Sequence, residues 1–427
     1  MNILFVVPAF PGRVSEYLIL PSLELCILSS ILKKDGHNVQ LLDMKINRLT
    51  IDNIHQTLIK YDIPDIVLIE DSPEVHCNSK KLIPILKSIY GNQLPIAIRG
   101  EIPSFEPAMV LERNPLLDFI VRFDDDYAFY HIVNHIRNNS TNFEEIYNIA
   151  FRESNRICVT ETKKRQYNLD SLPLPDRRLY DIQKYLLRDS ETIVRSTRGC
   201  PGSCLFCIKT RYEEFGAFSV KRFVDEIIEL QNMGFESFFF SDDTFAYSDN
   251  RLREFADEVE RRGINVRFTS NIRIKDINEY KISTLKRIGA YRVFVGIETV
   301  NTTTSKILNK NLKLEEIKKK IEILHRYDME FHASFILGSP NDNEEDLEAT
   351  IQFVKEIKPT IVTFNMIKAY PGLPLYNDPD KYGIIMEDPF WFEKDLWSRK
   401  CVIGTNNLPP EALEKWSRRM LFEFIEG

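Results

Sequence analysis

The sequence predicts an α/β fold in which an N-terminal doubly wound parallel sheet is followed by a partial (βα)6 barrel and a short C-terminal helical extension. Two observations support this class. Short apolar runs alternate with amphipathic helical stretches in two series, before residue 140 and after residue 190, and such alternation is typical of βαβ units. The chain has 427 residues, which at about 150 residues per domain is enough for two or three domains.

Residues 1–140 make up the first predicted domain. Its strands are expected where short apolar runs end at polar or turn residues, as in a buried parallel sheet, at residues 3–7, 39–42, 66–69, 96–98 and 119–121. Helices are expected at residues 18–34, 52–60 and 79–90, with a last one ending near His135. Ligands of such sheets bind at the carboxyl ends of the strands. No Gly-x-Gly-x-x-Gly follows the first strand, so a nicotinamide dinucleotide site has no support.

The rest of the chain divides into three predicted segments. Residues 141–190 are interpreted as a linker, with a hairpin at 149–161 and a proline-punctuated stretch at 172–176 that favours an extended chain. Residues 191–373 form the partial barrel, with strands expected at 192–196, 237–240, 266–269, 292–295, 332–336 and 361–364. Six strands fall short of the eight that close a barrel. Residues 374–427 form the extension, which contains Trp391, Trp397 and Trp416 and ends in a helix that opens after Pro409.

Composition argues against several classes of function. Acidic residues outnumber basic ones by 63 to 56, so the formal net charge is −7 and no basic excess is present for binding nucleic acid. No apolar stretch reaches the ~20 residues of a membrane span, and Met1 does not open a secretory signal. We therefore expect a cytoplasmic protein that neither crosses a membrane nor binds nucleic acid.

The distribution of cysteines is uneven. Three of the seven, Cys200, Cys204 and Cys207, lie within eight residues, directly after the first strand of the barrel series. Three thiolates on one loop can bind three irons of a four-iron cluster and leave the fourth iron open. A structural zinc site would need a fourth Cys or His, and the nearest are Cys158, 42 residues before Cys200, and His325, 118 residues after Cys207. A zinc-stabilised binding protein without catalysis stays open as a distant alternative.

The spacing Cys-x3-Cys-x2-Cys, with the aromatic Phe206 before the last cysteine, resembles the radical S-adenosylmethionine (SAM) superfamily. The resemblance implies that Cys200, Cys204 and Cys207 ligate a 4Fe–4S cluster whose unique iron binds the amine and carboxylate of SAM. In that superfamily one electron cleaves SAM to methionine and a 5′-deoxyadenosyl radical. It also implies an electron donor such as flavodoxin or ferredoxin.

Residues at the carboxyl ends of later strands resemble the SAM-lining positions of the superfamily. The set implied to line SAM is Phe206, Asp242, Asp243, Arg273, Glu298 and Gly338. Taken by themselves, the two aspartates also fit a polar turn, Arg273 a solvated surface and Gly338 an ordinary turn. Glu298 follows a buried apolar strand and therefore needs a partner.

The first domain, the linker and the barrel together resemble the cobalamin-binding branch of the superfamily. This implies a cobalamin-binding-like first domain, cobalamin as a cofactor, and a C-methyltransferase acting on an unactivated carbon of a small molecule or peptide. Paired glycines usual in that branch are replaced by Arg99-Gly100-Glu101, and a later Gly-Glu-rich segment by residues 122–126. A cobalamin-independent radical SAM dehydratase, epimerase or cyclase is therefore the alternative. No Asp-x-His-x-x-Gly pattern surrounds His37, His55 or His76, so none is expected to bind cobalt.

Overall fold

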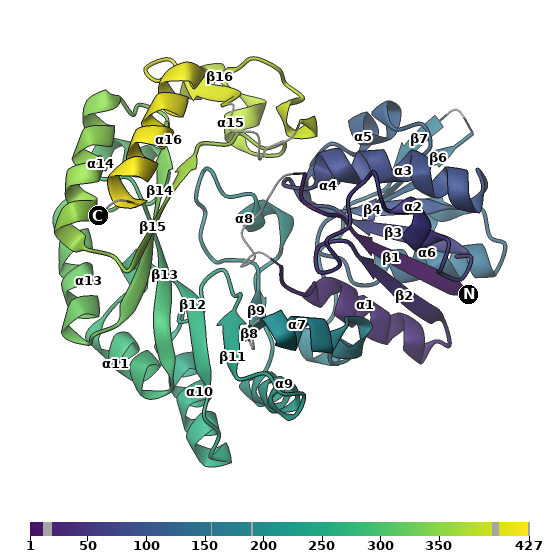
Figure 1. Ribbon diagram of the computed structural model, residues 1–427, viewed down its shortest axis with the longest axis horizontal. Coiled ribbons are helices and arrows are strands. Elements are labelled where there is room, and N and C mark those ends of the chain that lie inside the picture. Colours follow the sequence, from purple (N-terminus) through teal and green to yellow (C-terminus); the bar gives the residue numbers. More distant parts are fainter. Residues whose placement is uncertain (12–18, 155, 189–190, 395–400, 426–427) are drawn as a thin grey trace. The chain divides into compact units, whose positions relative to one another are not determined.

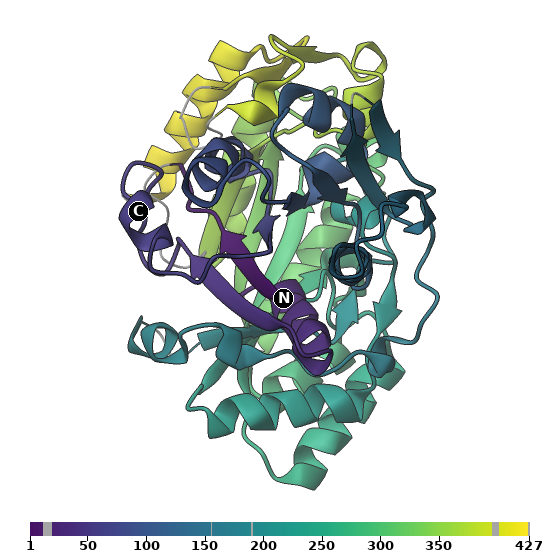
Figure 2. The ribbon, with the colours of Figure 1, turned by 90° about the vertical axis from the view of Figure 1, so that its right-hand side faces the viewer.

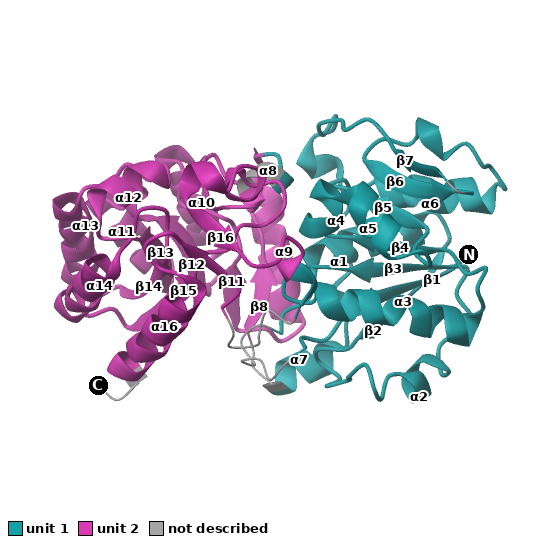
Figure 3. Cartoon of the chain, turned by 90° about the horizontal axis from the view of Figure 1, so that it is seen from above, with its two compact units in different colours: residues 1–189, 212–214, 392–398 teal, residues 190–211, 215–391, 399–427 magenta. Residues whose placement is uncertain are grey.

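The computed structural model describes residues 1–11, 19–154, 156–188, 191–394 and 401–425. The chain forms two compact units (Figure 3). Unit 1 comprises Met1–Asp189, Tyr212–Glu214 and Phe392–Ser398, and unit 2 comprises Ser190–Arg211, Phe215–Trp391 and Arg399–Gly427. Among the described residues, no helix combines the length and the apolar character that crossing a membrane requires.

Unit 1 is built on a seven-stranded sheet with the order β2-β1-β3-β4-β5-β6-β7. Its strands are β1 (Asn2–Val7), β2 (Asn38–Asp43), β3 (Ile66–Glu70), β4 (Ile96–Arg99), β5 (Phe119–Val121), β6 (Ile149–Glu153) and β7 (Arg156–Val159). Its helices are α1 (Leu23–Lys34), α2 (His55–Leu58), α3 (His76–Tyr90), α4 (Glu101–Phe105), α5 (Pro107–Arg113), α6 (Ala128–Arg137) and α7 (Ile182–Arg188). Strands β1 to β5 are parallel, as predicted, and Figures 1 and 2 both show β1 and β2 in purple, side by side.

Local sequence explains how α1 is placed against this sheet. Ser22 accepts a hydrogen bond from the backbone N–H of Leu25, which caps the helix and fixes its start. The expected helix began at residue 18, but residues 12–18 lie outside the described part of the chain. Apolar residues of α1 and α6 share one core with alternate residues of the strands, among them Phe5 and Phe129 with ring centroids 6.1 Å apart.

The segment 141–190, predicted to be a linker, is part of unit 1 instead. Its hairpin forms as expected, but β6 also pairs with β5 in antiparallel fashion and buries Ile149 and Phe151 in the core of the unit. Further along, Asp176 Oδ2 accepts hydrogen bonds from Ser29 and Lys33 of α1. The separate linker was wrong because these apolar and polar contacts bury the segment against the sheet and α1.

Unit 2 contains a six-stranded sheet of parallel strands that neighbour one another in chain order. These strands are β8 (Glu191–Val194), β11 (Ser237–Phe240), β12 (Arg267–Arg273), β13 (Ala290–Glu298), β14 (Glu330–Leu337) and β15 (Ile361–Met366). The main helices are α9 (Val220–Asn232), α10 (Asp249–Arg262), α11 (Glu279–Arg287), α13 (Leu314–Arg326) and α14 (Glu344–Ile357). Figure 1 shows α10, α11, α13 and α14 along one face of this sheet. The predicted partial barrel is therefore confirmed.

Shorter elements complete unit 2 and its carboxyl-terminal part. They are β9 (Thr197–Arg198), β10 (Gly216–Ala217), α8 (Lys209–Tyr212), α12 (Thr302–Ile307), α15 (Pro374–Asn377), β16 (Ile384–Met386), β17 (Ile403–Thr405) and α16 (Pro410–Ile425). Leu413 of α16 packs in a core cluster with Leu337 and Ile351. Trp391 is buried and its indole N–H donates to the backbone oxygen of Ala369, 3.2 Å away, whereas Trp397 lies outside the described residues.

Candidate active site

The three clustered cysteines occupy the loop that follows β8 and β9. All three are free thiols of intermediate exposure. Gly199, just before the first of them, has a φ of 65°, a conformation that glycine adopts without strain. This loop therefore presents three thiols that are partly accessible to a ligand.

A buried carboxylate anchors the start of this loop. Asp242 follows β11 and is completely buried. Its oxygens accept hydrogen bonds from the backbone N–H of Ser196 at 3.1 Å, from the Ser196 hydroxyl at 2.7 Å and from the Thr197 hydroxyl at 2.5 Å. Asp242 was predicted to line SAM. In this structure its carboxylate binds the chain that leads into the cysteine loop, and it therefore positions that loop.

Cys200 lies among two of the predicted charged residues. The Gly202 N–H donates to Cys200 Sγ at 3.3 Å, and a Cβ at Gly202 would come within 4.0 Å of a guanidinium nitrogen of Arg273. Burial raises the pKa of the Cys200 thiol, with the charge of Asp243 acting in the same direction and that of Arg273 in the opposite one. The structure thus brings Cys200, Asp243 and Arg273 together. Arg273 is also held by Asp276, whose carboxylate accepts from its Nε.

The other two cysteines face an ion pair that sequence reasoning missed. Lys310 Nζ lies 3.1 Å from Glu298 Oε1 and donates to the Gly296 backbone oxygen at 3.1 Å. The same ammonium is 5.8 Å from the centre of the Phe206 ring. Burial acts to lower the pKa of Lys310, but Glu298 and the thiols of Cys204 and Cys207 outweigh it, so that the pKa is raised.

Glu298 is held in an unusual backbone conformation. It ends β13 with a φ of 72°, in a region that side chains other than glycine rarely adopt. The register between β13 and β14 shifts at this point, between Gly296 and Glu298. A Cβ at Gly296 would lie 2.3 Å from Glu298 Oε1, so any larger residue there would displace this carboxylate from its present position. The need for a partner, inferred from the sequence, is met by Lys310.

Gly338 follows β14 and faces the C-terminal helix. It has a φ of 74°, and a Cβ there would come within 2.5 Å of the Leu413 side chain of α16. In the structure Gly338 therefore permits a close approach of the C-terminal helix to the end of β14. Its predicted contact with SAM stays a prediction.

The carboxyl ends of the strands of unit 1 carry a second polar cluster. His76 Nδ1 lies 2.7 Å from Asp71 Oδ2, and the Ser79 hydroxyl donates to Asp71 Oδ1 at 2.6 Å. His76 Nε2 is buried and has no hydrogen-bond partner among the described residues. A Cβ at Gly100 would lie 2.5 Å from the Asp71 backbone oxygen, so the chain after β4 passes very close to that after β3.

Glu70 and Arg99 lie at the same ends. Desolvation, together with the nearby charge of Glu24, raises the pKa of Glu70 to about 6. Burial acts to lower the pKa of Arg99, but Tyr212, Glu24 and Glu70 outweigh it and the pKa is raised. This edge of unit 1 therefore holds charged groups away from water, as a ligand-binding edge does.

Comparison with known proteins places this site in a family. Residues 194–354 match the model of the radical SAM superfamily. An uncharacterized methyltransferase of Pyrococcus horikoshii is 25% identical over 88% of this chain and 82% of the relative. The anaerobic magnesium-protoporphyrin IX monomethyl ester cyclase of Cereibacter sphaeroides is also 25% identical, over 88% of this chain and 63% of the relative.

Two solved structures share the fold of both units. The radical SAM methyltransferase TsrM of Kitasatospora setae, solved with cobalamin and a 4Fe–4S cluster, superposes with a TM-score of 0.78 at 14% identity, covering 100% of this chain and 88% of its own. The cobalamin-dependent SAM radical enzyme OxsB superposes with a TM-score of 0.69 at 19% identity, covering 89% of this chain and 56% of its own. Residues 194–354 therefore match the radical SAM superfamily, and the chain as a whole shares the fold of TsrM and OxsB.

Proposed function

We propose that this protein is a cobalamin-dependent radical SAM C-methyltransferase that acts on an unactivated carbon of a small molecule or peptide. The observation that carries the proposal is the set of three half-buried thiols on one loop, flanked by Asp243 and Arg273 on one side and by the Glu298–Lys310 pair on the other. Three thiolates leave one iron of a four-iron cluster open, and the charges beside them suit a ligand that carries both an amine and a carboxylate.

The donor set fits a 4Fe–4S cluster. Cys200, Cys204 and Cys207 would hold three of its irons, and the cluster, when bound, supplies the electron that cleaves SAM. The residues of the chain bind and orient. Arg273 offers a guanidinium for the carboxylate of SAM, and Asp243 offers an acceptor for its amine.

The carboxyl edge of unit 1 fits cobalamin by its chemistry. Cobalamin carries many amide side chains, and this edge supplies charged and hydrogen-bonding groups, including the unpartnered Nε2 of His76. The fold it shares with TsrM and OxsB, both solved with cobalamin, supports the assignment. The bound corrin would supply the methyl carrier, and the polar groups of this edge would hold its periphery.

The substrate class rests on one neighbour. TsrM has been solved with tryptophan as substrate and a SAM analogue bound. A substrate of that size agrees with the expectation of a small molecule or a peptide side chain.

A specific observation favours a second candidate, a cobalamin-independent radical dehydratase, epimerase or cyclase. After β5 the chain carries Phe123 with a φ of 60°, and its ring packs edge-to-face on Phe105 with centroids 5.5 Å apart. Bulky side chains at this position narrow the approach of a large cofactor to the backbone. The Cereibacter sphaeroides relative is named a cyclase, and ring closure is one of the reaction types of this candidate.

One anaerobic experiment separates these candidates. The reconstituted protein is incubated with a reductant, with SAM carrying a deuterated methyl group, and with hydroxocobalamin, and corrinoid binding is followed by visible absorption. We expect bound corrinoid, S-adenosylhomocysteine and a product that carries the label. Formation of 5′-deoxyadenosine without bound corrinoid would favour the second candidate, and zinc without iron in the reconstituted protein would overturn both.

A further inference from the structure

The segment that joins α12 to α13 buttresses the cysteine loop. The backbone N–H of Leu205 donates to the Leu308 oxygen at 3.1 Å. Asn309 Nδ2 donates to the Ser203 backbone oxygen at 2.9 Å and to the Ser203 hydroxyl at 2.6 Å. Ser203 is exposed and lies in sequence between the first two cysteines. This segment thus touches the thiol-bearing loop and is itself exposed at Asn309.

A cavity of about 490 Å³ opens at this contact, and its lining is basic. It is lined by Ser203, Lys275, Asn309, Lys310, Asn311, Leu312, Glu316 and Lys320. Three lysines thus face a single glutamate. The exposed residues Lys306 and Lys313 flank the lining segment in sequence. We call Lys275, Lys306, Lys310, Lys313 and Lys320 the lysine patch.

Among the described residues, most of this positive charge has no carboxylate partner. Lys310 pairs with Glu298, and Lys320 donates to the backbone oxygen of Ile277. Lys275, Lys306 and Lys313 are exposed, and none forms an ion pair with any residue that the structure describes.

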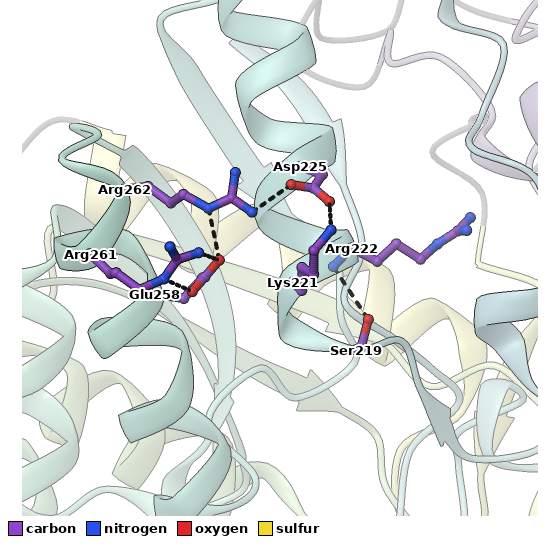
Figure 4. Close-up of polar contacts among 7 residues, drawn as sticks. All are labelled: Ser219, Lys221, Arg222, Asp225, Glu258, Arg261 and Arg262. Carbon is purple, nitrogen blue, oxygen red and sulfur yellow. Dashed lines mark hydrogen bonds and ion pairs between the residues drawn. The ribbon is translucent and has the colours of Figure 1, made fainter.

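The outer face of α9 and α10 shows the contrasting arrangement (Figure 4). Lys221 lies 2.8 Å from Asp225, and Arg261 lies 2.6 Å from Glu258. Arg262 bridges both carboxylates. Each of these three cations is therefore paired with a carboxylate, whereas Lys275, Lys306 and Lys313 of the lysine patch form no ion pair with a described residue.

The lysine patch differs in charge from the chain as a whole. The chain as a whole carries a net charge of −7, so at long range it repels an acidic protein. At physiological salt, charges are screened beyond about 8 Å, so attraction must come from a local group of cations. Electron-transfer complexes typically have small interfaces, and electrostatic attraction determines much of their rate of formation.

We propose that the lysine patch docks an acidic one-electron carrier protein of the flavodoxin or ferredoxin class, beside Ser203 and the cysteine loop. This inference rests on the proposed function, because it requires a 4Fe–4S cluster on Cys200, Cys204 and Cys207. The carrier is oxidised by one electron, the cluster is reduced from its 2+ to its 1+ state, and no bond forms or breaks in that transfer.

The test compares two double variants with the same change in net charge. Lys275→Glu/Lys313→Glu reverses two cations of the patch, and Lys221→Glu/Arg261→Glu reverses two cations of the α9–α10 face. The probe is an acidic bacterial flavodoxin. Its affinity for the reconstituted protein is measured at several salt concentrations, and cluster bleaching by its hydroquinone is followed by stopped-flow absorption. Bleaching by dithionite is the reference, and circular dichroism checks folding.

We expect the patch variant to lose about tenfold or more in affinity and in bleaching rate with flavodoxin, together with most of the salt dependence. Dithionite should bleach all three proteins alike. Equal losses in both variants, or no loss in either, would overturn the docking site. It would also be overturned if millimolar phosphate abolished flavodoxin binding while the patch variant bound flavodoxin normally. Failure of dithionite to bleach the wild type would instead count against the proposed function.

Discussion

The carboxyl ends of the parallel strands in the two units carry polar clusters of different kinds. In unit 2 the cysteines follow one another on a single loop, and charged partners from neighbouring strands surround them. In unit 1 the polar groups include a pair distant in sequence, Ser22 with Glu70, 48 residues apart, and no short motif marks it. A site made from one loop is readable in the sequence, whereas a site assembled across a sheet becomes visible only in the fold.

The largest effect should come from the loop itself. In Cys204→Ala one iron ligand is lost, so we expect the reconstituted protein to lose its iron–sulfur absorption and SAM cleavage to fall by on the order of 10⁴-fold. The matched control is Cys158→Ala, which removes a thiol of unit 1. If Cys158→Ala lost iron to the same extent, the assignment of the cluster to the loop would be wrong.

Next in size is the effect of the charge that sequence reasoning missed. Lys310→Met leaves the Glu298 carboxylate buried without its cation, which costs about 1–3 kcal/mol, so SAM affinity should fall about 10- to 100-fold. Equilibrium binding of SAM to the reconstituted protein measures it. Lys306→Met, four residues earlier and exposed, should leave that affinity unchanged. Similar losses of SAM affinity in Lys310→Met and Lys306→Met would show that Lys310 acts only through the net charge of the protein.

The anchor of the cysteine loop should affect stability more than chemistry. Asp242→Asn keeps the size of the side chain but offers only one acceptor oxygen where the carboxylate accepts three hydrogen bonds. We expect unfolding free energy to fall by about 1–3 kcal/mol, measured by urea denaturation of the iron-free protein. Unchanged stability with lost SAM binding would instead place Asp242 at the ligand.

Two carboxyl groups allow the units to be compared by pH. Burial raises the pKa of Asp342 in unit 2 to about 7, and desolvation raises that of Glu70 in unit 1 to about 6. The folded state holds these protons more tightly than the unfolded state does. Their contribution to the free energy of unfolding is therefore complete below the unfolded pKa of about 4 and is lost as pH rises through 6 to 7. The decline is measured as the urea midpoint at several pH values. It should be shallower in Asp342→Asn and in Glu70→Gln than in the wild type. A steeper decline in either variant would contradict the assigned direction.

The smallest effect is expected on the α9–α10 face. Lys221→Ala removes an exposed ion pair with Asp225, and such pairs contribute about 0–1 kcal/mol. Thermal unfolding should therefore change little. A loss well above that range would mean that this face is a poor charge control for the lysine patch.

Most of the fold could be predicted because the periodicity that marks a strand or a helix is local. The boundary at residue 140 was wrong because the pairing of β6 with β5 is a tertiary contact, although buried Ile149 and Phe151 two residues apart were a signal for it. The cysteines could be predicted from spacing alone. Lys310 could not, because it lies 103 residues after Cys207 and reaches the site only through the turn after α12.

Gly338 and Asp242 show the opposite difficulty. Both occupy positions where the superfamily resemblance implied a ligand contact, and in this structure each serves a neighbouring part of the chain. A motif identifies the position on a strand, but packing decides which neighbour its side chain meets.

The division of the chain has a practical consequence for dissecting the protein. Phe392 and Glu393 belong to unit 1, where Glu393 pairs with Lys80 and Arg113, yet the residues before Phe392 and those after Ser398 belong to unit 2. A single protease cut near residue 190 would therefore not release a complete unit 1, since Tyr212–Glu214 and Phe392–Ser398 would stay on the C-terminal fragment. Expressing residues 1–189 alone would remove the partner of Lys80 and Arg113 and uncover the ring of His76 that Phe392 contacts.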